Sequence, residues 1–170
     1  MFQLLVNQDG GLTTTGYAVT IIVAILVLVA AFIFAGKASD RKKISTKQLV
    51  YCAMALALGF VTSYIKIFEL PFGGAVTACS MLFIVLIGYW YGAKTGILIG
   101  FVYGIMQFLQ GPYVLSFFQV CCDYLLAFAA LGLAGFFVHK KNGLVKGYIV
   151  AILGRGAFHV LGGYLYWMDY

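Results

Sequence analysis

Two long apolar stretches near the end of the chain carry side chains that lipid does not tolerate. They are Gln119 and Asp123 in residues 116–138, and Arg155 and His159 in residues 147–167. An ionisable group deep in a bilayer costs about 2.5–3.5 kcal/mol on insertion scales, so such groups face a bundle interior or a wet cavity and mark functional sites. We therefore interpret the two stretches as the walls of a ligand pocket.

These residue types suit a binding site for a cationic heterocycle. A carboxylate such as Asp123 beside aromatic faces attracts an organic cation through charge and cation–π contacts. The imidazole of His159 and the amide of Gln119 offer donors and acceptors to the edge of a heterocycle. The sequence has no Walker A motif, no H-E-x-x-H and no G-x-S-x-G, so we predict no catalytic residues and no cofactor. The set indicates a binding protein that depends on the energy of another subunit.

The composition places these residues in a membrane protein. Of the 170 residues, 64% are hydrophobic and only 9% are charged, against about 25% charged in a soluble domain. The net charge of +6 comes from basic residues in the short connections, which is a topology signal and not a nucleic-acid surface. The four cysteines lie in apolar runs without a histidine at metal-ligand spacing, so they predict neither a disulfide framework nor a metal site.

Six apolar runs predict an all-α polytopic bundle with six spanning helices. The runs cover residues 17–36, 48–67, 75–91, 95–110, 116–138 and 147–167. Each approaches the length that a helix needs to cross about 30 Å of hydrocarbon. A turn is predicted at 68–74, where Pro71 and two glycines interrupt the pattern. Gly96, Gly100 and Gly104 recur at intervals of four, which predicts a close helix contact.

The basic residues set the orientation of this multi-pass bundle in the cell membrane. With the N-terminus outside, the connections at 37–47, at Lys94 and at 140–146 all lie on the cytoplasmic side, as the positive-inside rule requires. Asp123 then lies roughly 10 Å and His159 roughly 12 Å below the outer surface. The two side chains can meet, and Tyr113 and Trp167 lie near the mouth of the site.

Plainer interpretations of the same residues stay open at this point. Asp123 and Arg155 can form a buried structural ion pair that offsets the cost of both charges. His159 can be a satisfied core group, and Tyr113 and Trp167 can be aromatic-belt residues of the membrane interface. Spacing alone does not separate these from a ligand site.

Several motifs together resemble those of a known transporter family. They are Pro71-Phe-Gly-Gly-Ala-Val-Thr77, the glycine run 96–104, Ser116-x-x-Gln119-x-x-x-Asp123-Tyr124, and Arg155-x-x-x-His159-x-x-x-Gly163-x-x-x-Trp167. Over about 120 residues from Gln48 onward, the chain resembles the thiamine-specific substrate-binding (S) components of energy-coupling-factor vitamin transporters. The resemblance implies a membrane subunit that captures thiamine from outside, then docks on a transmembrane coupling protein bearing two ATPase subunits.

The resemblance also implies a role for each site residue. Asp123, with Tyr124 beside it, stands where thiamine binders carry an acidic ligand contact. His159 stands at the histidine that hydrogen-bonds the aminopyrimidine, Trp167 at the tryptophan that stacks on the vitamin, and Tyr113 at an aromatic residue of the outer loop. Ala53 and Ala57 match the small-residue motif that docks the coupling protein, although the same face can serve internal packing.

The chain departs from the family pattern at three places. Family members carry glutamate where this chain has Asp123, so a shorter arm must reach the same atom. Residues 1–47 form an additional N-terminal helix and basic loop ahead of the S-component-like bundle of residues 48–170. The family's last helix has no counterpart after Tyr170, so we expect a truncated chain. The rival functions are an S-component for another heterocycle, an intramembrane enzyme with Asp123 and His159 as acid and base, and a structural subunit.

Overall fold

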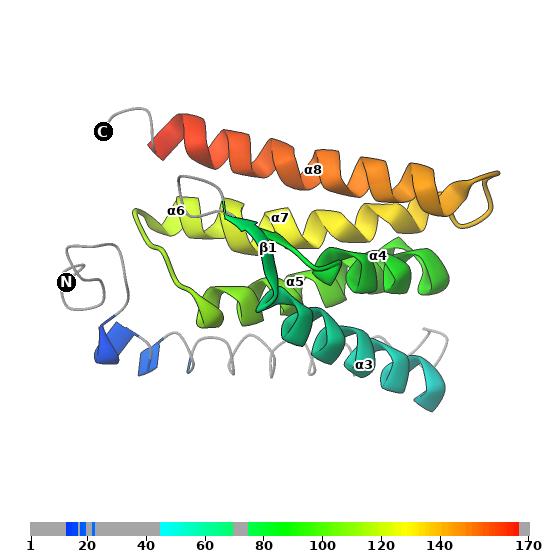
Figure 1. The fold of residues 1–170 in the computed structure, drawn as a ribbon, viewed down its shortest axis with the longest axis horizontal. Coiled ribbons are helices and arrows are strands. Elements are labelled where there is room, and N and C mark those ends of the chain that lie inside the picture. Colours follow the sequence, from blue (N-terminus) through cyan, green and yellow to red (C-terminus); the bar gives the residue numbers. More distant parts are fainter. Residues whose placement is uncertain (1–12, 17, 20–21, 23–44, 70–74, 167–170) are drawn as a thin grey trace, which may run out of the picture.

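The computed structural model describes residues 13–16, 18–19, 22, 45–69 and 75–166. Its elements are arranged as a bundle of helices, with a short hairpin between α3 and α4 that is drawn across the middle of the bundle in Figure 1. In chain order they are α3 (Thr46–Ser63), β1 (Lys66–Glu69), β2 (Ala75–Thr77), α4 (Ser80–Tyr91), α5 (Ala93–Gln110), α6 (Phe117–Val120), η1 (Cys121–Leu126), α7 (Ala127–Ala129), η2 (Ala130–Phe137) and α8 (Gly143–Tyr166). The predicted first span at 17–36 lies almost wholly outside the described residues.

The four elements from Phe117 to Phe137 follow one another without a break, and we call them the central helix. Its winding changes along its length, from α to a π segment at Cys121–Leu126 and to a 3₁₀ segment at Ala130–Phe137. The 3₁₀ segment packs against α4, α5 and α8. The predicted span at 116–138 therefore agrees with the structure to within one residue at each end, but its uniform winding does not.

The glycine run of α5 makes the predicted close contact, and its partner is the central helix. A Cβ on Gly100 or Gly104 would collide with the backbone carbonyl of Phe128 or Tyr124, respectively. Farther along, a Cβ on Gly96 would lie 2.8 Å from the Cα of Gly132. Small residues let the two backbones approach in this way because no side chain separates them.

Tyr103 fixes the position of α3 against this pair of helices. Its ring is fully buried and meets the ring of Phe128 edge-on, with centroids 5.2 Å apart. Its hydroxyl donates to the carbonyl oxygen of Gly59 at 2.9 Å. A buried phenol needs such a partner, so Tyr103 links α3, α5 and the central helix through one side chain.

The predicted second and third spans are shorter than the sequence pattern indicated. Helix α3 ends at Ser63, not at residue 67, and α4 begins at Ser80, not at residue 75. Between them β1 and β2 pair antiparallel, with Lys66 opposite Thr77. Residues 65–69 contain two isoleucines and a phenylalanine, and β-branched and aromatic side chains suit an extended strand better than a helix. The bundle is helical as predicted, but this hairpin was missed, and its turn at 70–74 lies outside the described residues.

Six spanning helices are not established by the described residues. Two helices there are long and apolar enough to cross a membrane, Phe117–Phe137 and Gly143–Gly162, and the apolar helix α4 has only 12 residues. The start of α8 also falls earlier than predicted, at Gly143 instead of residue 147.

Exposed lysines are concentrated at one end of the bundle, which we call the basic end. It comprises the start of α3, the end of α4, the start of α5, and the turn between η2 and α8, at the right of Figure 1. Its exposed cations are Lys47, Lys94, Lys140, Lys141 and Lys146. The only described acidic residues, Glu69 and Asp123, lie elsewhere. Asp123, Arg155 and His159 occupy the half of the bundle away from the basic end.

Candidate functional site

Gln119 is held rigidly at the start of the central helix. Ser116 caps the helix, and its hydroxyl oxygen accepts the Gln119 backbone N–H at 3.1 Å. The Gln119 side chain is 1% exposed, and its Oε1 accepts the backbone N–H of Leu115 at 3.2 Å. Because that bond fixes the amide orientation, Nε2 is left to donate to Asp123 Oδ2 at 2.7 Å.

Asp123 and His159 are in contact, as the depth argument predicted. Nδ1 of His159 lies 3.1 Å from Oδ1 of Asp123. The Nε of Arg155 donates to Nε2 of His159 at 3.2 Å. Arginine has no acceptor, so Nε2 must accept and the ring proton must sit on Nδ1. The histidine is therefore a neutral bridge that donates to a carboxylate already accepting from Gln119.

The direct ion pair between Asp123 and Arg155 is not the arrangement that the structure adopts. The Arg155 guanidinium instead lies over the ring of Phe128, 4.1 Å from its centroid. Arg155 is thus linked to the Asp123 carboxylate through the imidazole of His159. Each hydrogen bond in this series is donated in the direction of Asp123. Sequence reasoning placed Arg155 near the site but missed its two partners, because neither spacing nor residue type indicates how a guanidinium orients.

Two backbone features make room for the carboxylate. Asp123 lies inside the π segment, and single π turns in α-helices are frequent at functional sites. On α8, a Cβ at Gly162 would lie 2.8 Å from Asp123 Oδ1. Gly163 belongs to the motif Arg155-x-x-x-His159-x-x-x-Gly163, and its neighbour Gly162 was overlooked. The Gly162-Gly163 pair is an available signal for the close approach of two elements.

Tyr124 and Tyr113 lie together at the loop that precedes the central helix. The Tyr124 hydroxyl donates to the Gly111 carbonyl at 2.9 Å and accepts the Tyr113 backbone N–H at 3.2 Å. Its ring packs edge-on against Phe108. The hydroxyl of Tyr124 is therefore committed to the loop, and this residue positions Tyr113, whose side chain is partly exposed.

The remaining candidate residues fall in different places. Trp167 lies outside the described residues. Ala53 and Ala57 are both exposed on α3, on the side away from the buried residues Cys52, Ala55 and Gly59. Internal packing of this face against the described helices is thereby ruled out.

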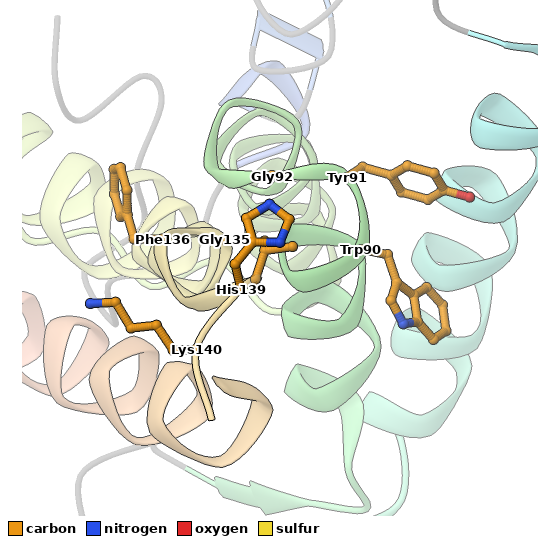
Figure 2. A pocket seen from close by; sticks show the side chains of 8 residues that line it. Trp90, Tyr91, Gly92, Gly135, Phe136, His139 and Lys140 are labelled. Carbon is orange, nitrogen blue, oxygen red and sulfur yellow. The ribbon is translucent and has the colours of Figure 1, made fainter. Parts of the chain in front are cut away.

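The expected open pocket between the two walls does not occur between Asp123 and His159, since these side chains touch. A cavity of about 580 Å³ lies instead at the basic end (Figure 2), lined by Trp90, Tyr91, Gly92, Gly135, Phe136, Val138, His139 and Lys140. Within the described ranges, no group of three or more histidine, cysteine or carboxylate side chains converges to hold a metal.

Comparison with known proteins identifies the family. The model of the family described as thiamine transporter protein (Thia_YuaJ) matches residues 49–170. The chain belongs to the thiamine transporter protein family. It is also 31% identical over 133 residues to the thiamine transporter ThiT of Bacillus subtilis (strain 168), covering 67% of this chain and 65% of that protein. The resemblance deduced from the motifs is confirmed, and the match begins close to the predicted domain boundary at residue 48.

Family membership bears on the class of the protein. The family is described as one of thiamine transporters, which are membrane proteins and not enzymes. The chain spans about two thirds of the length of its curated relative, 65%.

Proposed function

We propose that this chain is the thiamine-binding subunit of an energy-coupling-factor uptake transporter, with high affinity for the vitamin. The observation that carries the proposal is membership of the thiamine transporter protein family. The relative from Bacillus subtilis is named as a thiamine transporter. The network around Asp123 adds a chemical reason within this chain.

Thiamine joins a cationic thiazolium ring to an aminopyrimidine, and the network offers a complement to each. Gln119 and His159 both donate to Asp123, so each carboxylate oxygen accepts a hydrogen bond from the protein. The Asp123 side chain is 14% exposed and that of His159 is 41% exposed, so a ligand can reach both. Asp123 attracts the cation, and the imidazole of His159 hydrogen-bonds the aminopyrimidine by exchanging one of its present partners.

Aromatic residues complete the proposed site. Tyr113, positioned by Tyr124, and Trp167 supply faces on which the two rings of the vitamin stack. The network lies in the half of the bundle away from the basic end. If the basic end is cytoplasmic, as the positive-inside rule favours, the site faces outward, the N-terminus is extracellular, and thiamine is captured from outside.

Removing the charge of Asp123 tests the ligand role. We expect Asp123→Asn to weaken thiamine binding by about 1.4 kcal/mol or more, a factor of ten, because a carboxylate–cation attraction in a partly dry site is lost. A neutral aminopyrimidine fragment should lose much less affinity, since it carries no charge. Titration calorimetry on the purified chain measures both ligands.

The control is Lys141→Gln, which removes an exposed charge at the basic end. It should leave both affinities unchanged. Equal weakening of thiamine and the neutral fragment by Asp123→Asn would remove the charge role of Asp123 but not thiamine transport. No thiamine binding by the parent chain, together with tight binding of another heterocycle, would instead favour the rival S-component.

The exposed face of α3 is the proposed contact with the transmembrane coupling protein, which carries the two ATPase subunits. Ala53 and Ala57 share this face, one turn apart, and present little side chain, which allows close helix approach. We expect Ala53→Phe with Ala57→Phe to leave thiamine affinity intact and to abolish uptake in cells that supply the coupling complex.

Leu58→Phe is the matched control for added bulk on α3. Leu58 is also exposed, at 46%, and lies about 100° around the helix from Ala57. It should support normal uptake. If the double variant loses thiamine binding, or if Leu58→Phe blocks uptake equally, the Ala53 and Ala57 face is not a specific docking surface.

A further inference from the structure

The cavity at the basic end combines aromatic and cationic lining that the proposed thiamine site does not use. It is lined by Trp90 and Tyr91 at the end of α4, Phe136 on η2, and His139 and Lys140 in the following turn. Figure 2 shows His139 between them, with the side chains of Trp90 and Tyr91 extending to one side and those of Phe136 and Lys140 to the other. At about 580 Å³ it falls in the size range of small-molecule sites. The backbone between these sides is close, since a Cβ at Gly135 would collide with Ala93.

The charge of this cavity selects the kind of ligand. Lys140 Nζ lies 4.7 Å from the centroid of the Phe137 ring, which holds the ammonium group in place without neutralising it. Lys94, Lys141 and Lys146 are exposed at the same end. Among the side chains that the structure describes, the carboxylate is that of Asp123, which lies in the π segment. A cation such as thiamine is repelled here, and an anion is attracted.

The aromatic residues indicate that the anion carries an apolar part. Trp90 is 55% exposed and Phe136 is 64% exposed, on the outer surface of helices from a membrane protein. Tryptophan is enriched at the boundary between hydrocarbon and headgroups. Basic pockets between helices at that level are the sites where anionic lipid headgroups bind.

We propose that this cavity binds the headgroup of an anionic phospholipid. His139, in the middle of the site, contacts the phosphate, and Lys140 attracts it from one side, while Trp90 and Phe136 lie against acyl chains on opposite sides of the headgroup. The site is independent of the thiamine site, because its lining shares no residue with the network around Asp123.

Trp90 is itself the reporter for the test. The chain has two tryptophans, so Trp167→Phe leaves Trp90 as the single fluorophore. The protein is placed in mixed micelles containing brominated phosphatidylglycerol or brominated phosphatidylcholine, whose bromine atoms quench nearby indoles. We expect the anionic lipid to quench at a clearly lower mole fraction than the zwitterionic lipid.

Adjacent lysines provide a matched pair of variants in this background. Lys140→Gln should raise the mole fraction of phosphatidylglycerol for half-quenching about fivefold, the factor for losing one cation near an anionic group. Lys141→Gln removes the same charge one residue outside the cavity lining and should change it less than about twofold. Introduced into the parent chain, which retains Trp167, both variants should leave thiamine affinity unaltered.

Three results would overturn the lipid site. Equal quenching by the two brominated lipids would show no headgroup preference. Equal shifts for Lys140→Gln and Lys141→Gln would reduce the effect to diffuse attraction by the basic end. Reversal of quenching by excess inorganic phosphate or glycerol phosphate would assign the cavity to a soluble anion.

Discussion

The two ends of the bundle treat charge in opposite ways. Around Asp123, Gln119 and His159 each donate to one carboxylate oxygen, and Arg155 donates to His159. At the basic end, by contrast, Lys94, Lys140, Lys141 and Lys146 are exposed, and Asp123 is remote from them. The first arrangement is neutral overall, and the second is a concentrated positive charge.

This difference follows from where each group of charges lies. A charge inside a bundle costs free energy unless it is paired, so the cost selects for a closed network. Lysines at helix ends remain in contact with water and headgroups, where an unpaired cation costs little. The internal network should therefore lose stability when one charge is removed, whereas the basic end should lose only attraction for anions.

The largest expected difference comes from neutralising Arg155. Arg155→Met keeps an apolar side chain over Phe128 but leaves His159 Nε2 without its donor and Asp123 without a nearby cation. We expect the free energy of unfolding to fall by up to about 3 kcal/mol. Lys141→Met at the basic end should change it by less than about 0.5 kcal/mol. Unfolding in mixed micelles at increasing denaturing detergent measures both.

A double variant tests whether Arg155 and Asp123 are energetically coupled through His159. Combining Arg155→Met with Asp123→Asn restores neutrality, so the double variant should be more stable than the sum of the single losses predicts, by about 1 kcal/mol. Strict additivity would mean that His159 does not couple Arg155 to Asp123. The contrast between the two ends would then reduce to ordinary packing.

The sequence predicted this network better than it predicted the path of the chain. Depth counting from helix ends brought Asp123 and His159 together because regular helices have a fixed rise per residue. The spacing of the glycines also predicted the contact at Gly100 and Gly104, since small residues at intervals of four share one face. The hairpin was missed because a short, mostly apolar segment such as residues 64–69 fits a helix or a strand equally well by hydropathy. Its β-branched and aromatic side chains are the signal that favours the strand.

The orientation of side chains was the other feature that the sequence did not predict. A direct ion pair between Arg155 and Asp123 was one of the open interpretations, yet the guanidinium lies on Phe128 and the imidazole intervenes. Which of two nearby partners wins depends on the relative rotation of α8 and the central helix. That rotation is set by close contacts such as Gly162 against Asp123, which appear only when both helices are in place.

The smallest expected effect sharpens the comparison at this contact. Gly162→Ala places a Cβ 2.8 Å from Asp123 Oδ1, so the carboxylate must shift away from His159, and we expect a loss of about 1 kcal/mol in stability with weaker thiamine binding. Gly156→Ala on the same helix is the control, since its Cβ would meet nothing within 4 Å. That change should be neutral or stabilising by about 0.5 kcal/mol, because alanine has a higher helix propensity than glycine. Thermal unfolding and calorimetry compare the two. If both alanines behave alike, the carboxylate has room to move, and the network around Asp123 is held less tightly than its hydrogen bonds imply.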